Sequence, residues 1–160
     1  MTFARLDKQM HIAKGDFADE RIVELLRIHH DTSHAVTPAG SAQALDLSGL
    51  QRPDIDFWAL WRDEALLCVG ALRRLSRGLG EVKSMHTAQA ARRTGAASAM
   101  LAHIVAAARA RGLERLNLET GSFAYFAPSR ALYAKHGFVE CGPYGQYRLD
   151  PNSTFMTLAL

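Results

Sequence analysis

The spacing of apolar residues changes along the chain and separates predicted helices from predicted strands. Between residues 19 and 34 the apolar positions recur at helical intervals, and the breakers at 37–40 end this segment. Apolar runs with strand character follow, and the first two, which flank a polar triplet at 62–64, predict a β-hairpin. These predicted strands are 55–61, 65–75 and 81–87. A short strand within 2–12 and a short helix or ordered loop at 45–50 complete this half of the chain.

In the second half of the chain, the sequence pattern predicts helices that alternate with short strands. The pattern predicts a strongly amphipathic helix over residues 95–111, and Gly112 ends it in a C-cap position. Pro128 suits the first turn of another helix, which ends at Gly137. Short strands are predicted at 116–118, 138–139 and 155–160, and a loop at 120–122. No repeat or linker interrupts this order, so we predict a single α+β domain over residues 1–160, with a mixed, mainly antiparallel central sheet flanked by helices.

Composition and charge exclude several classes of protein. The chain has 160 residues, of which 48% are hydrophobic and 22% charged, as in globular proteins rather than disordered ones. Its net charge of +3 comes with scattered arginines, which favours a solvated basic surface over nucleic-acid binding. No apolar run approaches the ~20 residues of a membrane span, and no signal peptide is recognised. We therefore expect a cytoplasmic protein without membrane or nucleic-acid partners. Cys68 lies in an apolar run and far from Cys141, which indicates a buried, inert thiol.

The segment 85–101 contains the clearest candidate chemistry. Two arginines, Arg92 and Arg93, precede Thr94 and Gly95, and a helix rich in small residues then begins. The first turn of a helix has N–H groups without intrahelical partners, and its dipole attracts anions. A phosphate can approach these groups because the next three residues have small side chains: Ala96, Ala97 and Ser98. The pattern predicts that a phosphorylated cofactor binds at this turn.

Two motifs in the second half of the chain carry a resemblance to a known family. The stretch 92–97, RRTGAA, and the stretch 131–138, ALYAKHGF, have a strand between them. In this order and separation they resemble the GNAT superfamily of acyl-CoA-dependent N-acyltransferases. Two further stretches, 118–122 (LETGS) and 150–156 (DPNSTFM), resemble a bacterial small-molecule branch often labelled YsnE-like. The resemblance implies a GNAT-type fold.

The resemblance also implies how acetyl-CoA would bind. The turn and helix start at 92–98 would hold the CoA pyrophosphate through backbone N–H groups. The strand end that carries Met85, His86 and Thr87 would splay from its neighbour and pair with pantetheine. Phe126 stands where family members commonly have an asparagine, which suggests packing against pantetheine instead of a hydrogen bond. Ala97 stands where many members have glycine, and alanine still lets a phosphate approach.

Family resemblance assigns the two candidate catalytic residues. Tyr133 matches the tyrosine that often protonates the departing thiolate, and a phenol is protonated at neutral pH as an acid must be. Its alternative is a tyrosine packed between helix and sheet. Glu81 stands on the strand that leads to the notch, where relatives carry a base that acts directly or through water. Two other interpretations of Glu81 stay open: a solvated carboxylate at the strand end, or a partner for Lys83. Glu119 is a second candidate for the base, and a structural role at its strand end is the other interpretation of that residue.

Histidines cluster at the end of the first predicted helix. His30 and His34 are spaced i, i+4 and lie on one face. The stretch HDTSH superficially matches a zinc helix, but it lacks the glutamate base and a third ligand, so we expect no metal. Two interpretations of His30 and His34 stay open: they bind the acceptor, or they are ordinary histidines of the surface and the helix end. His86 and His136 are expected to be structural or exposed.

Together these observations predict an acetyl-CoA-dependent N-acetyltransferase. The expected reaction transfers acetyl to the amine of a small molecule by direct attack in a ternary complex. Two alternatives stay open: a non-catalytic acyl-CoA-binding sensor and a peptide or protein N-acetyltransferase. A homodimer is an open possibility that only the resemblance suggests. The acceptor-side residues 31–54 contain no motif that names the acceptor.

Overall fold

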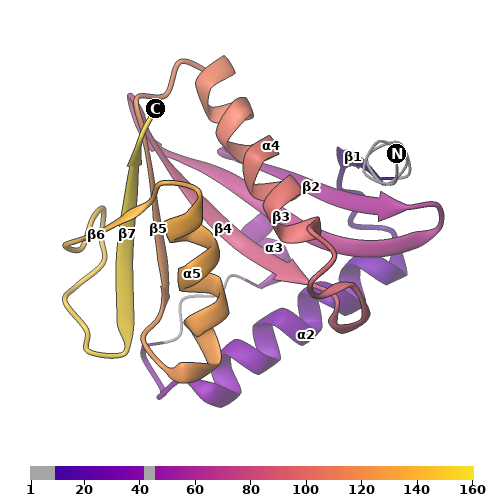
Figure 1. Cartoon of the computed structure of the whole chain (residues 1–160), viewed down its shortest axis with the longest axis horizontal. Coiled ribbons are helices and arrows are strands. Elements are labelled where there is room, and N and C mark those ends of the chain that lie inside the picture. Colours follow the sequence, from indigo (N-terminus) through magenta and orange to yellow (C-terminus); the bar gives the residue numbers. More distant parts are fainter. Residues whose placement is uncertain (1–9, 42–45) are drawn as a thin grey trace.

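One mixed β-sheet runs through the protein (Figure 1). The computed structural model describes residues 10–41 and 46–160. Within these residues, seven strands lie in the order β1-β2-β3-β4-β5-β7-β6. In chain order they are β1 (Met10–Lys14), β2 (Ile55–Arg62), β3 (Ala65–Ser76), β4 (Leu79–Thr87), β5 (Arg115–Gly121), β6 (Val139–Cys141) and β7 (Ser153–Ala159). Strands β4 and β5 pair in parallel, whereas the other neighbours pair antiparallel, which confirms the predicted mainly antiparallel sheet.

Helices and short 3-10 turns connect these strands. The α-helices are α2 (Glu20–Val36), α3 (Leu47–Leu50), α4 (Ala96–Ala110) and α5 (Ala127–Lys135), and the 3-10 turns are η1 (Gln89–Ala91) and η2 (Ala124–Phe126). Helix α2 begins where Asp19 accepts a hydrogen bond from the backbone N–H of Arg21, 2.9 Å away. Helix α4 joins the parallel pair β4 and β5, because a parallel connection must cross back over the sheet.

The two faces of the sheet carry separate hydrophobic clusters, and Figure 1 shows α4 and α5 in front of the strands. Side chains alternate along β3, so Cys68 and Leu72 belong to the cluster under α4 and α5, whereas Val69 and Ala71 belong to the cluster with α2. Gly70 lets α4 approach closely, since a Cβ there would lie 2.8 Å from Cγ of Met100. Helices thus cover the sheet on both faces.

Most predicted elements are present, with shifted ends. Helix α2 continues to Val36, and β5 runs through 120–121, so the loop predicted at 120–122 is wrong for its first two residues. The extended backbone continues there because β7 pairs with β5 as far as Gly121. Only 10–12 of the first predicted strand lie among the described residues, where β1 extends it to Lys14. None of the helices among the described residues has both the length and the apolar character to span a membrane.

Candidate active site

Strands β4 and β5 separate part-way along their length. They pair over three residues of each strand, from Leu79 to Glu81 on β4. Beyond this point β5 continues beside β7 to Gly121, and β4 continues beside β3 to Thr87. A split between two strands exposes backbone N–H and C=O groups with which an extended ligand can pair. The sheet therefore contains a notch of the kind that the family resemblance implied.

A bulge bends β4 at this split. The register between β3 and β4 steps from Ala71 opposite Lys83 to Val69 opposite His86, so two residues of β4 face one residue of β3. Ser84, one of these two, has a φ of 53°, in the left-handed region that residues with side chains rarely adopt. Bulges increase the twist of a strand and re-aim its side chains. The bend explains why β4 leaves β5 just after Glu81.

The turn after β4 presents backbone N–H groups at the start of α4. Arg93 and Gly95 have φ values of 64° and 87°, and Gly95 is the N-cap residue of α4. Gly95 provides no side-chain cap, so the first-turn N–H groups receive no hydrogen bond from it. A Cβ at Gly95 would meet open space, so glycine is needed here for its left-handed backbone conformation and not to avoid a clash. The turn has the form of an anion site.

Side chains around this turn leave it open and positive. Arg92 and Arg93 are exposed, and so are Thr94 and Gly95. The Thr94 hydroxyl donates to the carbonyl of Ala91 at 2.5 Å, which holds the turn in shape. The arginines therefore stand in solvent beside the start of α4, where they add to the positive end of the helix dipole.

The first residues of α4 are small and lie against the fold. Ala96 is buried, whereas Ala97 and Ser98 are half-buried. The hydroxyl of Ser98 lies 3.2 Å from Nε2 of His136, the C-cap residue of α5. His136 therefore joins the two helix ends that border the notch, a structural role in line with its prediction.

Phe126 packs beside the far end of β5. A Cβ on Gly121 would lie 2.1 Å from Cδ2 of Phe126, so the ring occupies the space that any other residue at 121 would need. Phe126 is half-buried, and its ring meets that of Tyr125 edge-on at 4.9 Å. The ring thus stands beside the end of β5 at Gly121.

Tyr133 projects from α5 into the core under the notch. It is 7% exposed, and its ring meets that of Phe138 at 5.8 Å. Burial raises the pKa of the Tyr133 phenol well above its usual value, and the nearby Cys68 and Glu119 raise it further. The phenol therefore stays protonated at neutral pH, as an acid must be before it donates its proton.

Glu81 is enclosed on the opposite face of the sheet. It is 0% exposed, and Oε2 accepts a hydrogen bond of 2.5 Å from the hydroxyl of Tyr144. The alternative that Glu81 is a solvated strand-end carboxylate is therefore wrong, since β4 continues past it and Tyr144 covers it. Among the described residues its other oxygen, Oε1, has no hydrogen-bond partner, although it is buried. An under-satisfied buried carboxylate is a mark of a functional site.

Lys83 extends this polar cluster along β4. Its Nζ donates to the hydroxyl of Tyr147 at 3.0 Å and lies 5.7 Å from the centre of that ring. Burial lowers the pKa of Lys83, while Glu81 and Glu119 act in the opposite direction. Lys83 thus interacts electrostatically with Glu81, and Tyr144 and Tyr147 of the β6–β7 connection hydrogen-bond to this pair of residues.

Glu119 lies on β5, across the split from this group. It is half-buried, and burial raises the pKa of its carboxyl to about 7. A hydrogen bond with Ser153 and the charge of Lys83 lower the pKa, whereas Glu81 and Asp150 raise it. Glu119 is a carboxyl group that changes protonation near neutral pH at the edge of the notch.

His29 is the histidine of α2 that reaches the cofactor strand. Its Nδ1 lies 3.0 Å from Nδ1 of His86, and the two rings meet edge-on at 5.0 Å. Burial lowers the pKa of His29 to about 3 and that of His86 to about 4, so both rings are neutral at pH 7. Because one Nδ1 must donate and the other accept, the contact sets opposite tautomers on the two rings. The contact ties the His86 side chain to α2, and His86 stays a predicted cofactor-binding residue.

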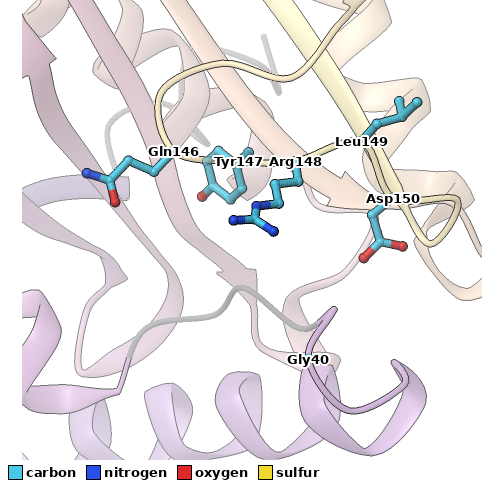
Figure 2. A pocket seen from close by; sticks show the side chains of 6 residues that line it. All are labelled: Gly40, Gln146, Tyr147, Arg148, Leu149 and Asp150. Carbon is cyan, nitrogen blue, oxygen red and sulfur yellow. The ribbon is translucent and has the colours of Figure 1, made fainter.

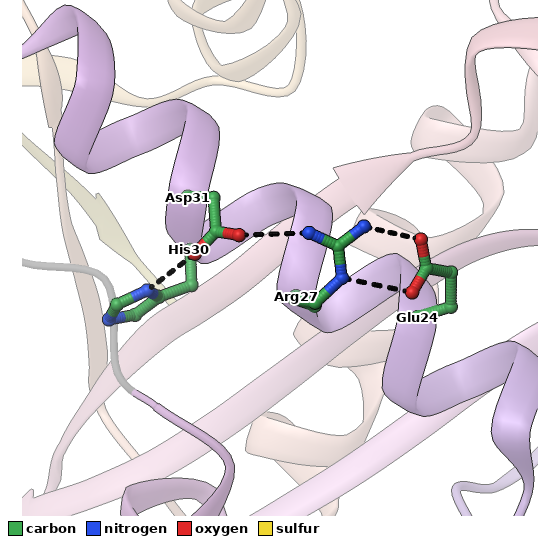
Figure 3. A network of polar contacts seen from close by, with 4 residues as sticks. All are labelled: Glu24, Arg27, His30 and Asp31. Carbon is green, nitrogen blue, oxygen red and sulfur yellow. Dashed lines mark hydrogen bonds and ion pairs between the residues drawn. The ribbon is translucent and has the colours of Figure 1, made fainter.

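His30 and His34, the predicted acceptor-binding pair, lie along the outer part of α2. Their rings are 4.1 Å apart, and Nδ1 of His30 lies 3.4 Å from Oδ1 of Asp31. Figure 3 shows this contact continuing to Arg27, which pairs with Asp31 at 3.0 Å and with Glu24 at 2.6 Å. Exposed pairs of this kind contribute little to stability, because solvent screens them. His30 also lines a cavity of about 240 Å³ between α2 and α3.

A larger cavity lies beside the polar cluster. It measures about 400 Å³ and is lined by Gly40 and residues 146–150. Figure 2 shows the Arg148 guanidinium between the ring of Tyr147 and the carboxylate of Asp150. Tyr147 belongs both to this cavity and to the buried cluster, since its hydroxyl accepts from Lys83. The cavity therefore adjoins the buried polar cluster through Tyr147.

Sequence patterns pointed to the proposed cofactor side of this site and gave no indication of the contacts around it. Tyr147 and Arg148 were not singled out, nor was the contact of Tyr144 with Glu81 or that of His29 with His86. Their contacts join segments far apart in the chain, and the loop residues follow no period. One signal was readable: Glu81 and Lys83 stand two apart on the predicted strand, on either side of Val82, which places both on one strand face. No group of three or more metal-ligating side chains lies together within the described ranges.

Comparison with known proteins agrees with this geometry. The family model described as Acetyltransferase (GNAT) family matches residues 20–138. The N-acetyltransferase YsnE of Bacillus subtilis is 43% identical over 94% of this chain and 100% of its own length. The N-acetyltransferase YedL of Escherichia coli is 42% identical over 93% of this chain and 94% of its own. An IAA acetyltransferase of Azospirillum brasilense is 38% identical over 91% of this chain and 94% of its own.

Solved structures agree on the fold. A putative acyl-CoA N-acyltransferase from Klebsiella pneumoniae superposes with a TM-score of 0.79 at 25% identity, over 94% of this chain and 97% of its own. An acetyltransferase of Bacillus subtilis in complex with CoA has a TM-score of 0.72 at 14% identity, over 94% of this chain and 99% of its own. The predicted GNAT-type fold is confirmed. This chain therefore belongs to the acetyltransferase (GNAT) family, as the paired motifs at 92–97 and 131–138 predicted.

Proposed function

We propose that this protein transfers the acetyl group of acetyl-CoA to the amine of a small molecule by direct attack in a ternary complex. One observation carries the proposal: the split between β4 and β5 leads directly into the open turn at the start of α4. A ligand with an extended arm and a diphosphate fits this arrangement, because the arm can pair with the strand edge and the diphosphate with the helix start.

The donor side of the site uses two adjacent segments. In the proposal, residues 92–98 hold the diphosphate, with Arg92 and Arg93 adding charge to the N–H groups of α4. The backbone of Met85, His86 and Thr87 pairs with pantetheine where β4 has left β5, and Phe126 packs against the arm. The related fold of Bacillus subtilis that contains CoA supports this choice of cofactor.

The chemistry that the protein must supply is modest. An amine held close to a thioester attacks its carbonyl carbon directly, and the carbon–sulfur bond then breaks. In the proposal, the Tyr133 hydroxyl donates its proton to the departing thiolate, a role that its protonated state allows. No acetyl-enzyme forms, so donor and acceptor must be bound together.

The acceptor is proposed to bind on the face that carries Glu81. The cavity of about 400 Å³ beside Tyr147 has the volume for a small molecule, and its charged groups are Arg148 and Asp150. Because Glu81 is enclosed and holds Tyr144, we propose that it fixes the β6–β7 connection over the site, in place of the base role that the resemblance suggested. His30 and His34 stay predicted acceptor-side residues on α2.

Acetyl transfer by purified protein tests this function. The protein is incubated with acetyl-CoA and pools of free amines, with IAA and short peptides as separate arms, and the released thiol is measured. The proposal predicts CoA release with free amines. No release above the blank in any arm would favour an acyl-CoA-binding sensor, and release with peptides alone would favour a peptide acetyltransferase.

Charge reversal at the turn tests the donor site. The double variant Arg92→Glu, Arg93→Glu should weaken acetyl-CoA binding by at least about 10-fold, the equivalent of one lost charge-assisted hydrogen bond. Arg109→Glu is the matched control, because Arg109 is an exposed arginine in the last turn of the same helix. Equal affinity of the double variant and the control would contradict the donor site.

A further inference from the structure

The cavity of about 400 Å³ lies between two connections of the chain. Gly40 lines it from the connection between α2 and α3, and residues 146–150 line it from the connection between β6 and β7. Next to these lining residues, Nδ2 of Asn152 donates to the hydroxyl of Ser41 at 3.3 Å. A direct hydrogen bond therefore joins the two walls of the cavity.

Asp150 supplies the negative charge among the lining residues, and its own surroundings engage it. Its Oδ1 accepts a hydrogen bond from the backbone N–H of Asn152 at 2.8 Å. A hydrogen bond with Ser41 lowers the pKa of the Asp150 carboxyl most, and the bond from Asn152 lowers it further. Asp150 is thus ionised at neutral pH, and its oxygens serve to hold the two connections together.

Arg148 supplies the positive charge among the lining residues. Its neighbour Tyr147 is held in place, since the Tyr147 hydroxyl accepts from Lys83 at 3.0 Å. Figure 2 shows the Arg148 guanidinium between the Tyr147 ring and the Asp150 carboxylate. Arg148 is exposed, and in the described part of the chain its guanidinium has neither a hydrogen bond nor an ion pair. Its N–H donors are therefore available to a bound molecule.

Carboxyl groups of the sheet lie near the same cavity. Burial raises the pKa of the Tyr147 phenol, and the nearby carboxyl groups of Glu81 and Glu119 raise it further. Asp150 in turn acts on the carboxyl of Glu119. Glu81 and Glu119 belong to β4 and β5, the two strands that separate at the notch. Tyr147 thus adjoins a free guanidinium and is within electrostatic reach of two carboxyl groups.

A ligand that has both an ammonium and a carboxylate matches these charges. A planar guanidinium binds a carboxylate through two parallel N–H···O bonds, which fix the orientation of the ligand. The carboxyl groups at the split attract the ammonium end. A simple alkylamine would leave the guanidinium unused, and a diamine would bring a second positive charge to it, which disfavours both.

We propose that the acceptor is an amino acid, whose carboxylate binds the guanidinium of Arg148 while its amine is directed to the split between β4 and β5. The carboxylate takes no part in the chemistry and remains unchanged on the acetylated product. This inference rests on the proposed function, since it names the class of acceptor and the residue that selects it.

The test uses pairs of acceptors that differ in one charge. Common α-amino acids and ω-amino acids are each compared with their primary amides, and CoA release gives kcat/KM for both members of a pair. The amine of an amide differs in basicity from that of its amino acid, so the ratio of the two values is compared between proteins, where this difference cancels. Binding of acetyl-CoA, measured by calorimetry, shows for each variant that the fold and the donor site are intact.

Three substitutions vary the charge at position 148. Arg148→Gln removes it, Arg148→Lys keeps it without the planar fork, and Arg148→Glu inverts it. Arg77→Gln is the matched control, because Arg77 is an exposed arginine in the turn between β3 and β4, and it should leave the ratio unchanged.

Wild type should prefer the amino acid to its amide. Arg148→Gln is expected to lower kcat/KM for the amino acid by about 10-fold or more, mainly through KM, as the loss of a charge-assisted hydrogen bond does. The value for the amide should change far less. Arg148→Lys should retain part of the preference, and Arg148→Glu should reduce it below that of Arg148→Gln.

The outcomes separate this inference from the function on which it rests. An equal ratio of amino acid to amide in wild type and Arg148→Gln would overturn the assignment. Transfer by wild type only to amines that lack a carboxylate would overturn it too, and the proposed function would then stand. If wild type releases no CoA with any amine, the proposed function itself fails.

Discussion

The hydroxyl of Tyr144 donates a hydrogen bond to Oε2 of Glu81 at 2.5 Å, across 63 positions of sequence. Both residues are buried, and the contact fastens the β6–β7 connection to the centre of β4. Burial raises the pKa of Tyr144 far above its usual value, and the charge of Glu81 raises it further. The phenol therefore remains a donor over the whole working pH range, and the loop stays closed over the polar cluster.

Removing this donor should cost stability. Tyr144→Phe leaves Oε2 of Glu81 buried without its hydrogen bond, which typically costs about 1–3 kcal/mol. Urea unfolding measures the loss, and Tyr125→Phe on an exposed ring is the control. In Glu81→Gln, Tyr144→Phe should cost less than in wild type, because the charge that needed the donor is gone. An identical cost in both backgrounds would show that the pair does not interact.

Tyr133→Phe tests the acid directly. The substitution keeps the ring contact with Phe138 and removes only the proton donor. We expect kcat to fall by about 10²-fold with little change in the affinity for acetyl-CoA, because the thiolate then leaves without a proton. Binding by calorimetry and turnover by thiol release separate the two effects. Unchanged turnover would leave Tyr133 as a packing residue of the helix and sheet interface.

Space at the β5 side of the notch depends on one glycine. Gly121→Ala would place a Cβ 2.1 Å from Cδ2 of Phe126, so the ring must move. Moving it should raise the KM for acetyl-CoA, and Gly142→Ala is the control, because a Cβ there meets nothing within 4 Å. The double variant Gly121→Ala, Phe126→Ala should recover affinity if the displaced ring blocks the notch. If the affinity for acetyl-CoA does not recover in the double variant, the loss comes from a change in β5 itself and not from the displaced ring.

The histidine pair between α2 and β4 predicts acid sensitivity. The pKa values of His29 and His86 lie near 3 and 4 in the folded protein, below the usual 6.5. The unfolded chain therefore binds more protons than the folded one below pH 6.5. Stability from these neutral rings is complete above that pH and is lost as pH falls towards the folded values, by up to about 1.4 kcal/mol per pH unit for each ring.

His29→Asn isolates this effect, since asparagine can keep a hydrogen bond to His86 without titrating. Between pH 7 and pH 5 the variant should lose less stability than wild type, by up to about 2 kcal/mol. The stability of the variant must be compared with that of wild type at each pH. Glu119 has a raised pKa, so its contribution to stability changes in the opposite direction between pH 4.5 and about 7 in both proteins. Parallel stability curves for the two proteins would refute the role of His29.

The segment proposed to hold the cofactor was recognisable in the sequence because it is local. The turn that includes Arg92, Arg93 and Gly95 and the helix that follows are consecutive in the chain, so one short segment contains both the charge and the open helix start. Tyr133 lies in one continuous motif with Gly137 and Phe138. Hydrophobic periodicity likewise located most helices and strands, because each buries one face.

The proposed acceptor side was not recognisable in the sequence, because its contacts join segments far apart in the chain. Tyr144 follows a turn-rich stretch, and nothing local indicates that its hydroxyl reaches Glu81. His29 and His30 are adjacent in α2, yet of these two residues only His29 points to His86. The raised pKa of Glu119 likewise results from tertiary structure. Its carboxyl group is buried, and residues from three other elements act on it. Such features depend on how the sheet twists and splits, which no single segment encodes.

A crystal structure of the protein with CoA tests the central claim most directly. We expect diphosphate oxygens within about 2.7–3.2 Å of backbone N–H groups in the first turn of α4, with the pantetheine arm along β4 beyond Glu81. A diphosphate bound elsewhere, or a helix start occupied by side chains of the protein, would contradict the proposed donor site.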